Sequence, residues 1–274
     1  KQLLADGWRP VARSCCVHPL LDPDQRPIVG HRGNAAHAPE NTMESFRQAL
    51  AAGAECLEMD VHLSGDGHVV VIHDPTLDRT TNATGAVAAL PLERIREADS
   101  GARFTRDGLT FPYRGAGLRV PTLEEVLREF ADVSILIEIK TAQASTETRR
   151  VIERSRAESR CVVESFDARA LDAFRGSRIA IGASTADVKR LLHRVVTRRK
   201  PRSLPYAVMC VPRRLRGVRV PIASLVRLTR PAGCLVHVWT INDPAVARRL
   251  WKVGVRGIIS DDPGLMRRLR DAGD

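Results

Sequence analysis

The sequence predicts an α/β protein, an eight-stranded (β/α)8 TIM barrel with a small insertion after a hairpin of its second and third strand runs. Short apolar runs alternate with amphipathic stretches along most of the chain, which is typical of a parallel sheet covered by helices. The length of 274 residues suits one such barrel. Because aromatic residues make up only 4%, the core is expected to consist mainly of Val, Leu, Ile and Ala.

Nine short apolar runs are expected to form strands. They are Ile28–Gly30, Cys56–Val61, Val69–Ile72, Ser134–Ile139, Cys161–Val163, Ile179–Ile181, Ala207–Val211, Leu235–Trp239 and Gly257–Ile259. Only seven residues, with Ser64 to Gly67 at their centre, separate the second run from the third, and a parallel crossover needs about a dozen. These two runs should therefore pair as an antiparallel hairpin that turns at Gly65-Asp66, which leaves eight strands for the barrel.

Several of the intervening stretches begin with clear helix caps. The cap candidates are Thr42, Thr122 with Glu125 at capping-box spacing, Asp243 before Pro244, and Asp262 before Pro263. The helix after Thr42 is expected to end before Gly53, and the helix after Asp243 is expected to end at Gly254. These signals support helices between the predicted strands.

Two regions depart from this alternation. Residues 1–27 contain four prolines and no sustained periodicity, so we expect an irregular N-terminal segment followed by a single barrel domain, residues 28–274. Residues 74–119 are rich in Thr, Gly, Arg and Asp, and they are interpreted as the insertion, lying over one face of the barrel.

The chain is strongly basic, with a net charge of +11 and a pI near 10.1. Such a charge suits an anionic partner, or it reflects solvated helix faces. The densest basic stretches are 194–202 and 213–219. No recognisable nucleic-acid-binding motif accompanies them, so no nucleic-acid partner is expected. No apolar run approaches the ~18 residues of a membrane-spanning helix, whereas peripheral membrane contact stays open.

Six cysteines are scattered through the chain without a C-x-x-C pair, which disfavours a zinc ribbon or a thioredoxin-like motif. Several lie in apolar runs, where a free thiol behaves as a small hydrophobe. We therefore expect a reducing compartment and a cytoplasmic location. Because the first residue is Lys1, a removed targeting segment, and with it a secreted or periplasmic location, stays open.

Charged residues at the predicted strand ends are the candidates for chemistry, because barrel active sites lie at the carboxyl ends of strands. His31 and Arg32 follow the first strand. Glu58 and Asp60 stand two apart in the second, so both carboxylates should enter the same space. Two carboxylates confined there repel each other unless a cation neutralises them, which favours a hard divalent ion such as Mg²⁺ or Ca²⁺.

Two further strand ends point to the same site. With the turn at Gly65-Asp66, antiparallel pairing places His73 beside Glu58. Glu138 and Lys140 should point inward together from the fourth run. They could supply a third carboxylate for the metal and a cation for a phosphate oxygen. The alternative is a local ion pair between Lys140 and some other acid.

Taken together, these motifs resemble the glycerophosphodiester phosphodiesterase family, from about Ile28 to the end of the chain. The matching motifs are His31-Arg-Gly33, Ala38-Pro-Glu-Asn-Thr42, Glu58-x-Asp60, Asp66-Gly67, His73-Asp74, Arg79-Thr-Thr81, Pro121-Thr-Leu-Glu124, Glu138-Ile-Lys140, Ser165-Phe166, Val238-Trp-Thr240 and Gly257-Ile-Ile259. The resemblance implies that residues 74–119 are the insertion characteristic of that family.

The resemblance also implies a role for each candidate residue. It makes His31 and His73 catalytic, Glu58, Asp60 and Glu138 ligands of one divalent metal ion, and Arg32, Lys140 and Trp239 substrate-binding residues. The ion would be Mg²⁺ or Ca²⁺, with Mn²⁺ as a further candidate, and the substrate a small phosphodiester.

The expected reaction is hydrolysis of a glycerophosphodiester to glycerol 3-phosphate and an alcohol, with the two histidines as general base and general acid. Three alternatives stay open: a related enzyme acting on lysophospholipids, a nucleic-acid-binding protein, and a catalytically silent barrel. The attacking hydroxyl, either water or the 2-hydroxyl of glycerol, and the oligomeric state also stay open.

Overall fold

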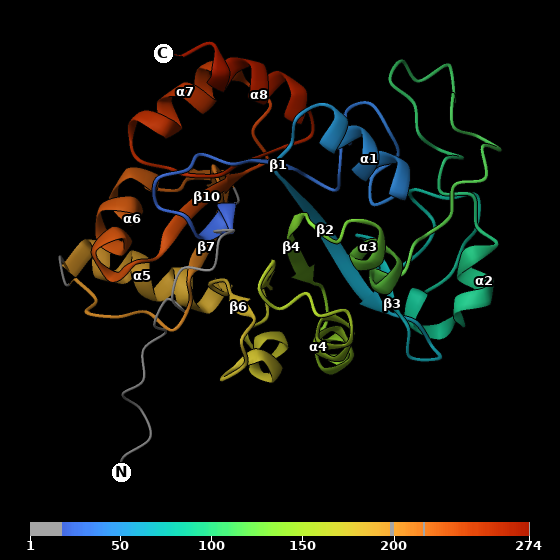
Figure 1. The fold of residues 1–274 in the computed structure, drawn as a ribbon, viewed down its shortest axis with the longest axis horizontal. Coiled ribbons are helices and arrows are strands. Elements are labelled where there is room, and N and C mark those ends of the chain that lie inside the picture. Colours follow the sequence, from blue (N-terminus) through green and yellow to red (C-terminus); the bar gives the residue numbers. More distant parts are fainter. Residues whose placement is uncertain (1–17, 198–199, 216, 274) are drawn as a thin grey trace.

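The computed structural model describes residues 18–197, 200–215 and 217–273, and within them it forms the predicted barrel (Figure 1). Eight parallel strands run in the order β6-β5-β4-β2-β1-β11-β10-β7. They are β1 (Ile28–Gly30), β2 (Cys56–Leu63), β4 (Ser134–Ile139), β5 (Cys161–Glu164), β6 (Ala180–Ile181), β7 (Val208–Pro212), β10 (Leu235–Trp239) and β11 (Ile258–Ser260). A parallel bridge between Gly182 and Val208 joins the two ends of this order, so the ring is nearly closed.

The predicted hairpin between β2 and β3 (Val69–Val71) is present, but its predicted register is wrong by one residue. Val61 pairs with Val71, and the Ile72 amide donates to the Asp60 carbonyl at 3.0 Å. His73 therefore lies just beyond Ile72 and not opposite Glu58. The Ser64 amide donates to the His68 carbonyl, so the turn between them has three residues instead of two, and Gly67 supplies the left-handed conformation, φ 87°, that such a turn needs.

Helices surround the barrel, and the four predicted caps are all observed. The helices are α1 (Met43–Ala51), α2 (Leu92–Arg96), α3 (Leu123–Glu129), α4 (Ser145–Arg154), α5 (Thr185–Thr197), α6 (Ile222–Thr229), α7 (Pro244–Lys252) and α8 (Pro263–Asp271). Thr122 and Glu125 form the reciprocal capping box at the start of α3. None of the helices in the described residues is long and apolar enough to span a membrane.

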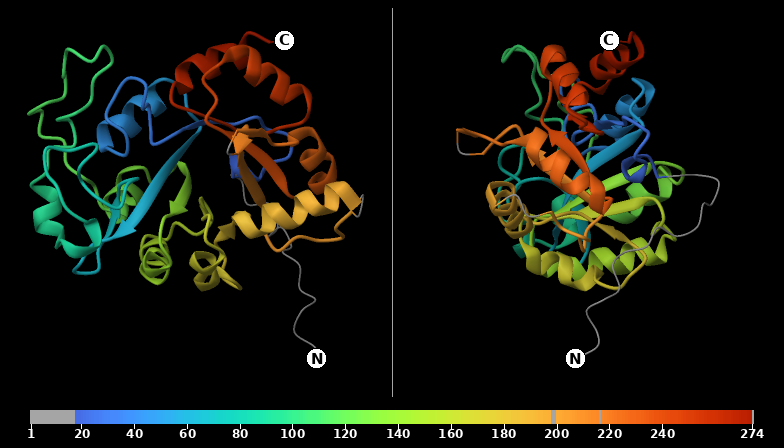
Figure 2. Two further views of the ribbon diagram at one scale, coloured as in Figure 1. Left: turned by 180° about the vertical axis from the view of Figure 1, so that it is seen from behind. Right: turned by 90° about the vertical axis from the view of Figure 1, so that its left-hand side faces the viewer.

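Two connections differ from the simple strand–helix alternation. A 3-10 helix, Ala168–Phe174, takes the place of an α-helix between β5 and β6. After β7 the chain forms a small two-stranded hairpin, β8 (Arg214–Leu215) and β9 (Val218–Arg219), before α6 begins. This hairpin projects from the body of the barrel, in orange in the right-hand view of Figure 2. It was not among the elements predicted from the sequence.

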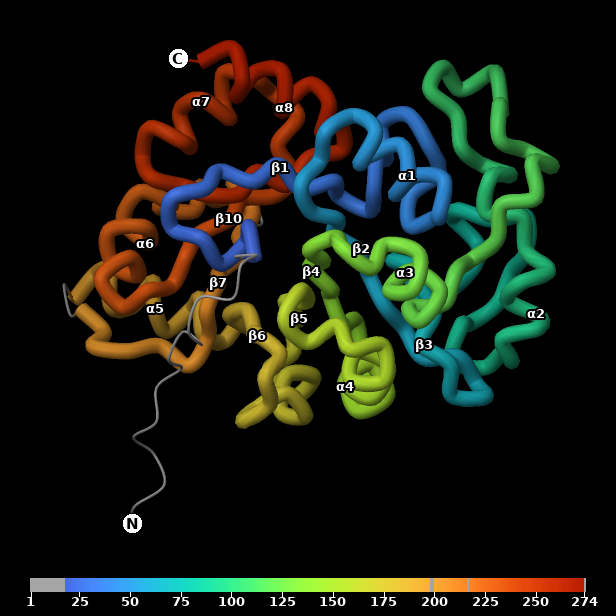
Figure 3. Tube along the Cα trace, viewed as in Figure 1, coloured from blue at the N-terminus to red at the C-terminus, as the bar shows by residue number. Residues whose placement is uncertain are grey.

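The insertion lies against the outside of the barrel, beside α1 and α3 (Figure 3). It contains α2 and has a small apolar cluster of its own, which includes Leu77, Val87 and Ile95. Tyr113 anchors its exposed part, because the phenol oxygen accepts a hydrogen bond from Gln48 Nε2 at 2.8 Å. The insertion is thus packed onto the barrel through α1.

A separate apolar cluster fills the inside of the barrel. Its buried members are Leu20, Val29, Cys56, Leu136, Val162, Ala180, Ala207, Val208, Cys210 and Ile259. Leu20 belongs to a 3-10 turn, Pro19–Leu21, and it closes the end of the barrel at which the strands begin. Residues 1–17 of the predicted irregular segment, including Cys15 and Cys16, lie outside the described residues. Cys56, Cys161, Cys210 and Cys234 are free and buried, as expected of thiols that pack as small hydrophobes.

Candidate active site

The predicted site residues meet at the carboxyl ends of the barrel strands. A pocket of about 60 Å³ is lined there by residues that follow or end β1, β2, β3, β4, β5, β10 and β11. They are His31, Arg32, Glu58, His73, Glu138, Lys140, Glu164, Phe166, Trp239 and Ile259. Asp60 is absent from this lining, because its side chain is only 1% exposed and its carboxylate is contacted by Arg32, Asn41 and Lys140. The structure therefore brings together all the side chains that the sequence singled out.

Glu58, Asp60 and Glu138 form one carboxylate cluster. One oxygen of each lies within 4.8 Å of the others, because β2 and β4 pair in register with Asp60 beside Glu138. Burial and the nearby charge of Asp60 raise the pKa of Glu58 to about 8. A divalent cation would remove this repulsion, and three oxygen donors are the ligands that Mg²⁺ and Ca²⁺ prefer. The chemistry of the donor set thus fits a hard divalent ion.

Lys140 is held by this cluster. Its Nζ lies 2.8 Å from Asp60 Oδ1 and 2.7 Å from Glu138 Oε1, so its ion-pair partners are two of the clustered carboxylates themselves. Burial alone would lower the pKa of Lys140, but the charges of both carboxylates outweigh burial and raise it. Lys140 is therefore a fixed cation that also lines the pocket.

Arg32 is positioned by its backbone and by two acids. It adopts a left-handed conformation, φ 53°, in which its amide donates to Glu58 Oε2 at 2.8 Å. Its guanidinium lies 3.1 Å from Asp60 Oδ2 and donates to Glu40 Oε1 at 2.9 Å. Asn41 adds a hydrogen bond to Asp60 Oδ2 at 2.9 Å. Glu40 and Asn41 thus orient the site, although they were predicted only as part of a family motif and not as site residues.

Both histidines have a carboxylate partner at Nδ1. His31 Nδ1 lies 2.7 Å from Asp261 Oδ1, and His73 Nδ1 lies 2.6 Å from Asp74 Oδ1. Burial alone would lower the pKa of His31, but the hydrogen bond to Asp261 and the charge of Glu58 outweigh burial and raise it. With Nδ1 engaged in each ring, Nε2 is the nitrogen available for proton transfer.

Glu164 is a half-buried carboxylate of the pocket that was not among the predicted site residues. Burial, followed by the charge of Glu138, raises its pKa to about 8. The signal was present in the sequence: in a strand that buries Val162 inside the barrel, the residue two positions later also points inward. The predicted strand ended at Val163, one residue too early to include it.

A second, mainly apolar chamber adjoins the catalytic pocket. It has a volume of about 110 Å³ and shares Glu138, Glu164, Phe166 and Trp239 with that pocket. Phe166 and Trp239 form its aromatic wall, with ring centroids 5.9 Å apart. Leu215, from the β8–β9 hairpin, lies at its outer side. The site thus combines a charged pocket with an apolar extension.

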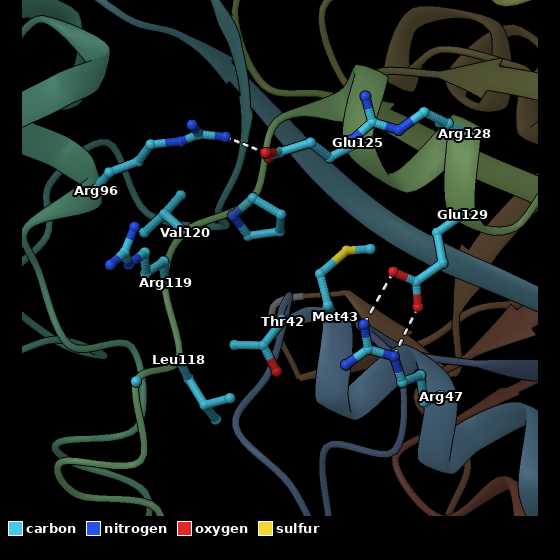
Figure 4. Close-up of a pocket in the computed structure, with 12 residues that line it drawn as sticks. Thr42, Met43, Arg47, Arg96, Leu118, Arg119, Val120, Glu125, Arg128 and Glu129 are labelled. Carbon is cyan, nitrogen blue, oxygen red and sulfur yellow. Dashed lines mark hydrogen bonds and ion pairs between the residues drawn. The ribbon is translucent and has the colours of Figure 1, made fainter.

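A larger cavity of about 370 Å³ lies elsewhere, between α1, α3 and residues 117–121, at the end of the insertion (Figure 4). Arg47 pairs there with Glu129 at 2.6 Å, and Arg96 pairs with Glu125. Neither His31 nor His73 lines this cavity, and none of the clustered carboxylates does. Its charged side chains instead tie α1 and the insertion to α3.

Comparison with known proteins supports the same assignment. The model of the Glycerophosphoryl diester phosphodiesterase family matches residues 31–265. A glycerophosphodiester phosphodiesterase of Caldanaerobacter subterraneus is 32% identical, covering 86% of this chain and 94% of its own length. A probable glycerophosphodiester phosphodiesterase 2 of Mycobacterium tuberculosis is 34% identical, covering 96% of each chain.

Solved structures agree in fold. A phosphodiesterase of Oleispira antarctica, in complex with the product sn-glycerol-3-phosphate, superposes with a TM-score of 0.74 at 26% identity, covering 90% of this chain and 97% of that one. A putative glycerophosphoryl diester phosphodiesterase of Silicibacter pomeroyi gives 0.75 at 27% identity, covering 93% and 97%. The chain therefore belongs to the glycerophosphoryl diester phosphodiesterase family of hydrolases.

Proposed function

We propose that the protein hydrolyses glycerophosphodiesters to glycerol 3-phosphate and an alcohol, using one divalent metal ion and two histidines. The observation that carries this proposal is a single pocket in which two carboxylate-partnered histidines face a cluster of three carboxylates. The glycerol 3-phosphate bound in the related Oleispira antarctica structure supports the choice of product.

Glu58, Asp60 and Glu138 are the proposed metal ligands, with Mg²⁺ or Ca²⁺ as the ion and Mn²⁺ as a further candidate. When bound, a divalent ion would polarise a phosphoryl oxygen and offset the negative charge that makes a phosphodiester resistant to attack. The raised pKa of Glu58 supports this assignment, because an unneutralised cluster keeps one of its protons at neutral pH.

Arg32 and Lys140 are proposed to bind the remaining phosphate oxygens. Arg32 presents a planar fork of N–H donors, whereas Lys140 acts as a point charge. Both side chains are already held by carboxylates, at 17% and 12% exposure, so little conformational freedom is lost when they bind the substrate. They supply positive charge where the transition state carries most negative charge.

His31 is proposed as the general base and His73 as the general acid. His31 removes a proton from the attacking hydroxyl, which is either water or the 2-hydroxyl of the glycerol. His73 donates a proton to the departing alkoxide. The carboxylates at Nδ1 orient both rings, an arrangement that favours proton exchange at Nε2. General acid–base catalysis of this kind typically accelerates a reaction about 10²–10⁴-fold.

The alcohol is proposed to leave through the apolar chamber beside Phe166 and Trp239. At about 110 Å³ the chamber is somewhat smaller than an engineered cavity of about 150 Å³ that holds benzene. It therefore suits an alcohol of a few heavy atoms, such as choline or ethanolamine.

The deciding experiment measures release of glycerol 3-phosphate from glycerophosphocholine, with and without EDTA, followed by addition of Mg²⁺, Ca²⁺ or Mn²⁺. We expect EDTA to abolish turnover and one of the ions to restore it. His31→Ala and His73→Ala should each lose most of the activity, whereas His68→Ala, on the exposed β2–β3 loop, serves as the matched control.

Three results would contradict parts of this proposal. Full turnover in EDTA rules out the metal, and near-normal turnover of both histidine variants rules out the acid–base scheme. Release from lysophosphatidylcholine in place of glycerophosphocholine changes the substrate class to monoacylated lipids. Detection of a cyclic glycerol phosphate by ³¹P NMR would identify the 2-hydroxyl as the nucleophile.

A further inference from the structure

The β8–β9 hairpin stands beside the mouth of the catalytic site. It directly follows the carboxyl end of β7, so it emerges on the same face of the barrel as the pocket. Leu215 lines the outer side of the apolar chamber and is 49% exposed, and Val218 is 72% exposed. Two aliphatic side chains are thus presented to solvent where the chamber opens.

The hairpin has one apolar and one basic face. Leu215 pairs with Val218, and Arg214 pairs with Arg219. Residues directly opposite across a ladder lie on one face, and successive residues alternate between faces. Two like charges opposite each other destabilise a ladder. Within the described residues no carboxylate forms an ion pair with Arg213, Arg214 or Arg219, and Arg214 instead donates to the Gly217 carbonyl.

The chain around the hairpin, residues 188–242, carries basic residues and no acidic ones. Residues 188–242 contain 13 of the 43 Lys and Arg residues and none of the 32 Asp and Glu residues. The rest of the chain is left with 30 basic and 32 acidic residues, so the net positive charge arises in this segment. Its elements, from α5 to β10, form the side of the barrel that carries the hairpin.

We propose that the β8–β9 hairpin docks the catalytic mouth onto an anionic phospholipid surface. Leu215 and Val218 enter the interfacial layer, and Arg213, Arg214 and Arg219 contact lipid phosphates. The basic face by itself would also suit a nucleic acid, but a nucleic acid offers no apolar phase for two exposed aliphatic side chains. A lipid surface offers both, and basic side chains near it strengthen binding additively.

The test is sedimentation with vesicles that mix phosphatidylglycerol and phosphatidylcholine, compared with vesicles of phosphatidylcholine alone. We expect the intact protein to bind only the anionic vesicles, and binding to fall as salt is raised. Each arginine near such a surface contributes about a fivefold factor, so R213Q/R214Q/R219Q should lower the partition coefficient on the order of 100-fold. L215S/V218S should lower it as well, through loss of interfacial burial.

The matched control is R94Q/R106Q/R128Q, which removes the same charge from exposed positions on the insertion and α3. It should retain more than half of the vesicle binding. Hydrolysis of a soluble diester by R213Q/R214Q/R219Q should be unchanged, which shows that this variant is folded and keeps vesicle binding separate from catalysis. Val218→Trp should show a blue shift of its fluorescence on anionic vesicles.

The proposal is overturned if the intact protein does not bind anionic vesicles at low salt, or if the control triple weakens binding as much as the hairpin triple. It is also overturned if Val218→Trp shows no shift, or if double-stranded DNA displaces the protein from vesicles at equal phosphate concentration. The last result would assign the basic side to a nucleic acid.

Discussion

Two histidines at one end of the barrel, His31 and His73, and two at the other, His18 and His237, lie in opposite electrostatic environments. At the catalytic end, the Nδ1 atoms of His31 and His73 lie against carboxylates. At the other end, His237 donates from Nε2 to the Leu20 carbonyl at 3.0 Å. Its Nδ1 accepts from the Gly257 amide at 2.7 Å. His237 is fully buried, and both of its hydrogen-bond partners are neutral backbone groups.

The difference shows that the partner, more than burial, decides the charge of a histidine in this fold. Burial lowers the pKa of His237 to about 4. Burial is also the largest cause at His18, where the charge of His237 adds to it, and the pKa of His18 likewise falls to about 4. Burial also acts on His31, but Asp261 and Glu58 reverse its effect and the pKa is raised. The structure therefore favours the protonated form of His31, whereas it keeps His18 and His237 neutral.

The largest effect is expected from exchanging the two kinds of histidine for amides. His31→Asn should lower kcat about 10²–10⁴-fold, because an amide cannot relay a proton, and should change the free energy of unfolding little. His237→Gln can keep both backbone hydrogen bonds, so its kcat should stay within about twofold. Turnover at saturating metal, together with denaturant unfolding, separates the two cases. Equal kcat losses in both variants would contradict the comparison.

A change of pH should test the neutral state of His237 through the free energy of unfolding of the protein. The folded-state pKa of His237, about 4, lies below the value near 6.5 expected when unfolded, so the unfolded chain binds more protons between these values. The stability contribution of neutral His237 is complete above about pH 6.5 and is lost as pH falls toward 4. The loss amounts to about 3 kcal/mol.

The measurement is the free energy of unfolding at several pH values for the intact protein and for His237→Gln. The difference between them isolates His237 from carboxylates that also titrate in acid. We expect the intact protein to lose more stability below pH 6.5 than the variant does. Parallel curves would show that His237 is not kept neutral by folding.

A smaller loss of stability is expected from filling the space beside His237. A Cβ at Gly257 would lie 2.4 Å from His237 Nδ1, a distance that forces the ring or the strand to move. Gly257→Ala should therefore destabilise the fold by about 1–3 kcal/mol. In Gly264→Ala, where the nearest atom would lie 3.2 Å away, the loss should be smaller. Thermal unfolding of both variants tests this, and an equal shift would contradict it.

Much of the catalytic end could be predicted from the sequence because its signals are local. The spacing of Glu58 and Asp60 fixes a shared face, and the capping box at Thr122 fixes the start of α3. The register of His73 could not be fixed so closely, because it depends on whether the loop at Gly67 has two or three residues. A change of one residue there moves each strand position to the other face.

Contacts between distant segments could not be predicted in this way. Asp261 reaches His31 only because β1 and β11 are neighbours in the closed barrel, although 230 residues separate them. Leu20 closes the opposite end from a segment with no periodicity, so nothing in its local sequence marks it as core. The irregularity of that segment was visible, but its place in the fold depends on the assembled strands.

The smallest effect concerns the pairing of His31 with Asp261, a carboxylate partner of a kind that His237 lacks. Asp261→Asn removes the charge and keeps an oxygen that can accept from Nδ1. The pKa of His31 should fall, because the remaining influence of burial lowers it. A general base works only when unprotonated, so the acid limb of the kcat/KM profile should move to lower pH. The maximal rate should fall about tenfold or less, since a less basic imidazole is a weaker base. A limb that stays in place would assign the proton acceptance to another group.

Asn242, which donates to Asp261 Oδ2 at 2.6 Å, offers the milder test. In Asn242→Ala the Asp261 carboxylate loses a competing hydrogen bond and holds the His31 proton more strongly. The acid limb of the kcat/KM profile should therefore move to higher pH.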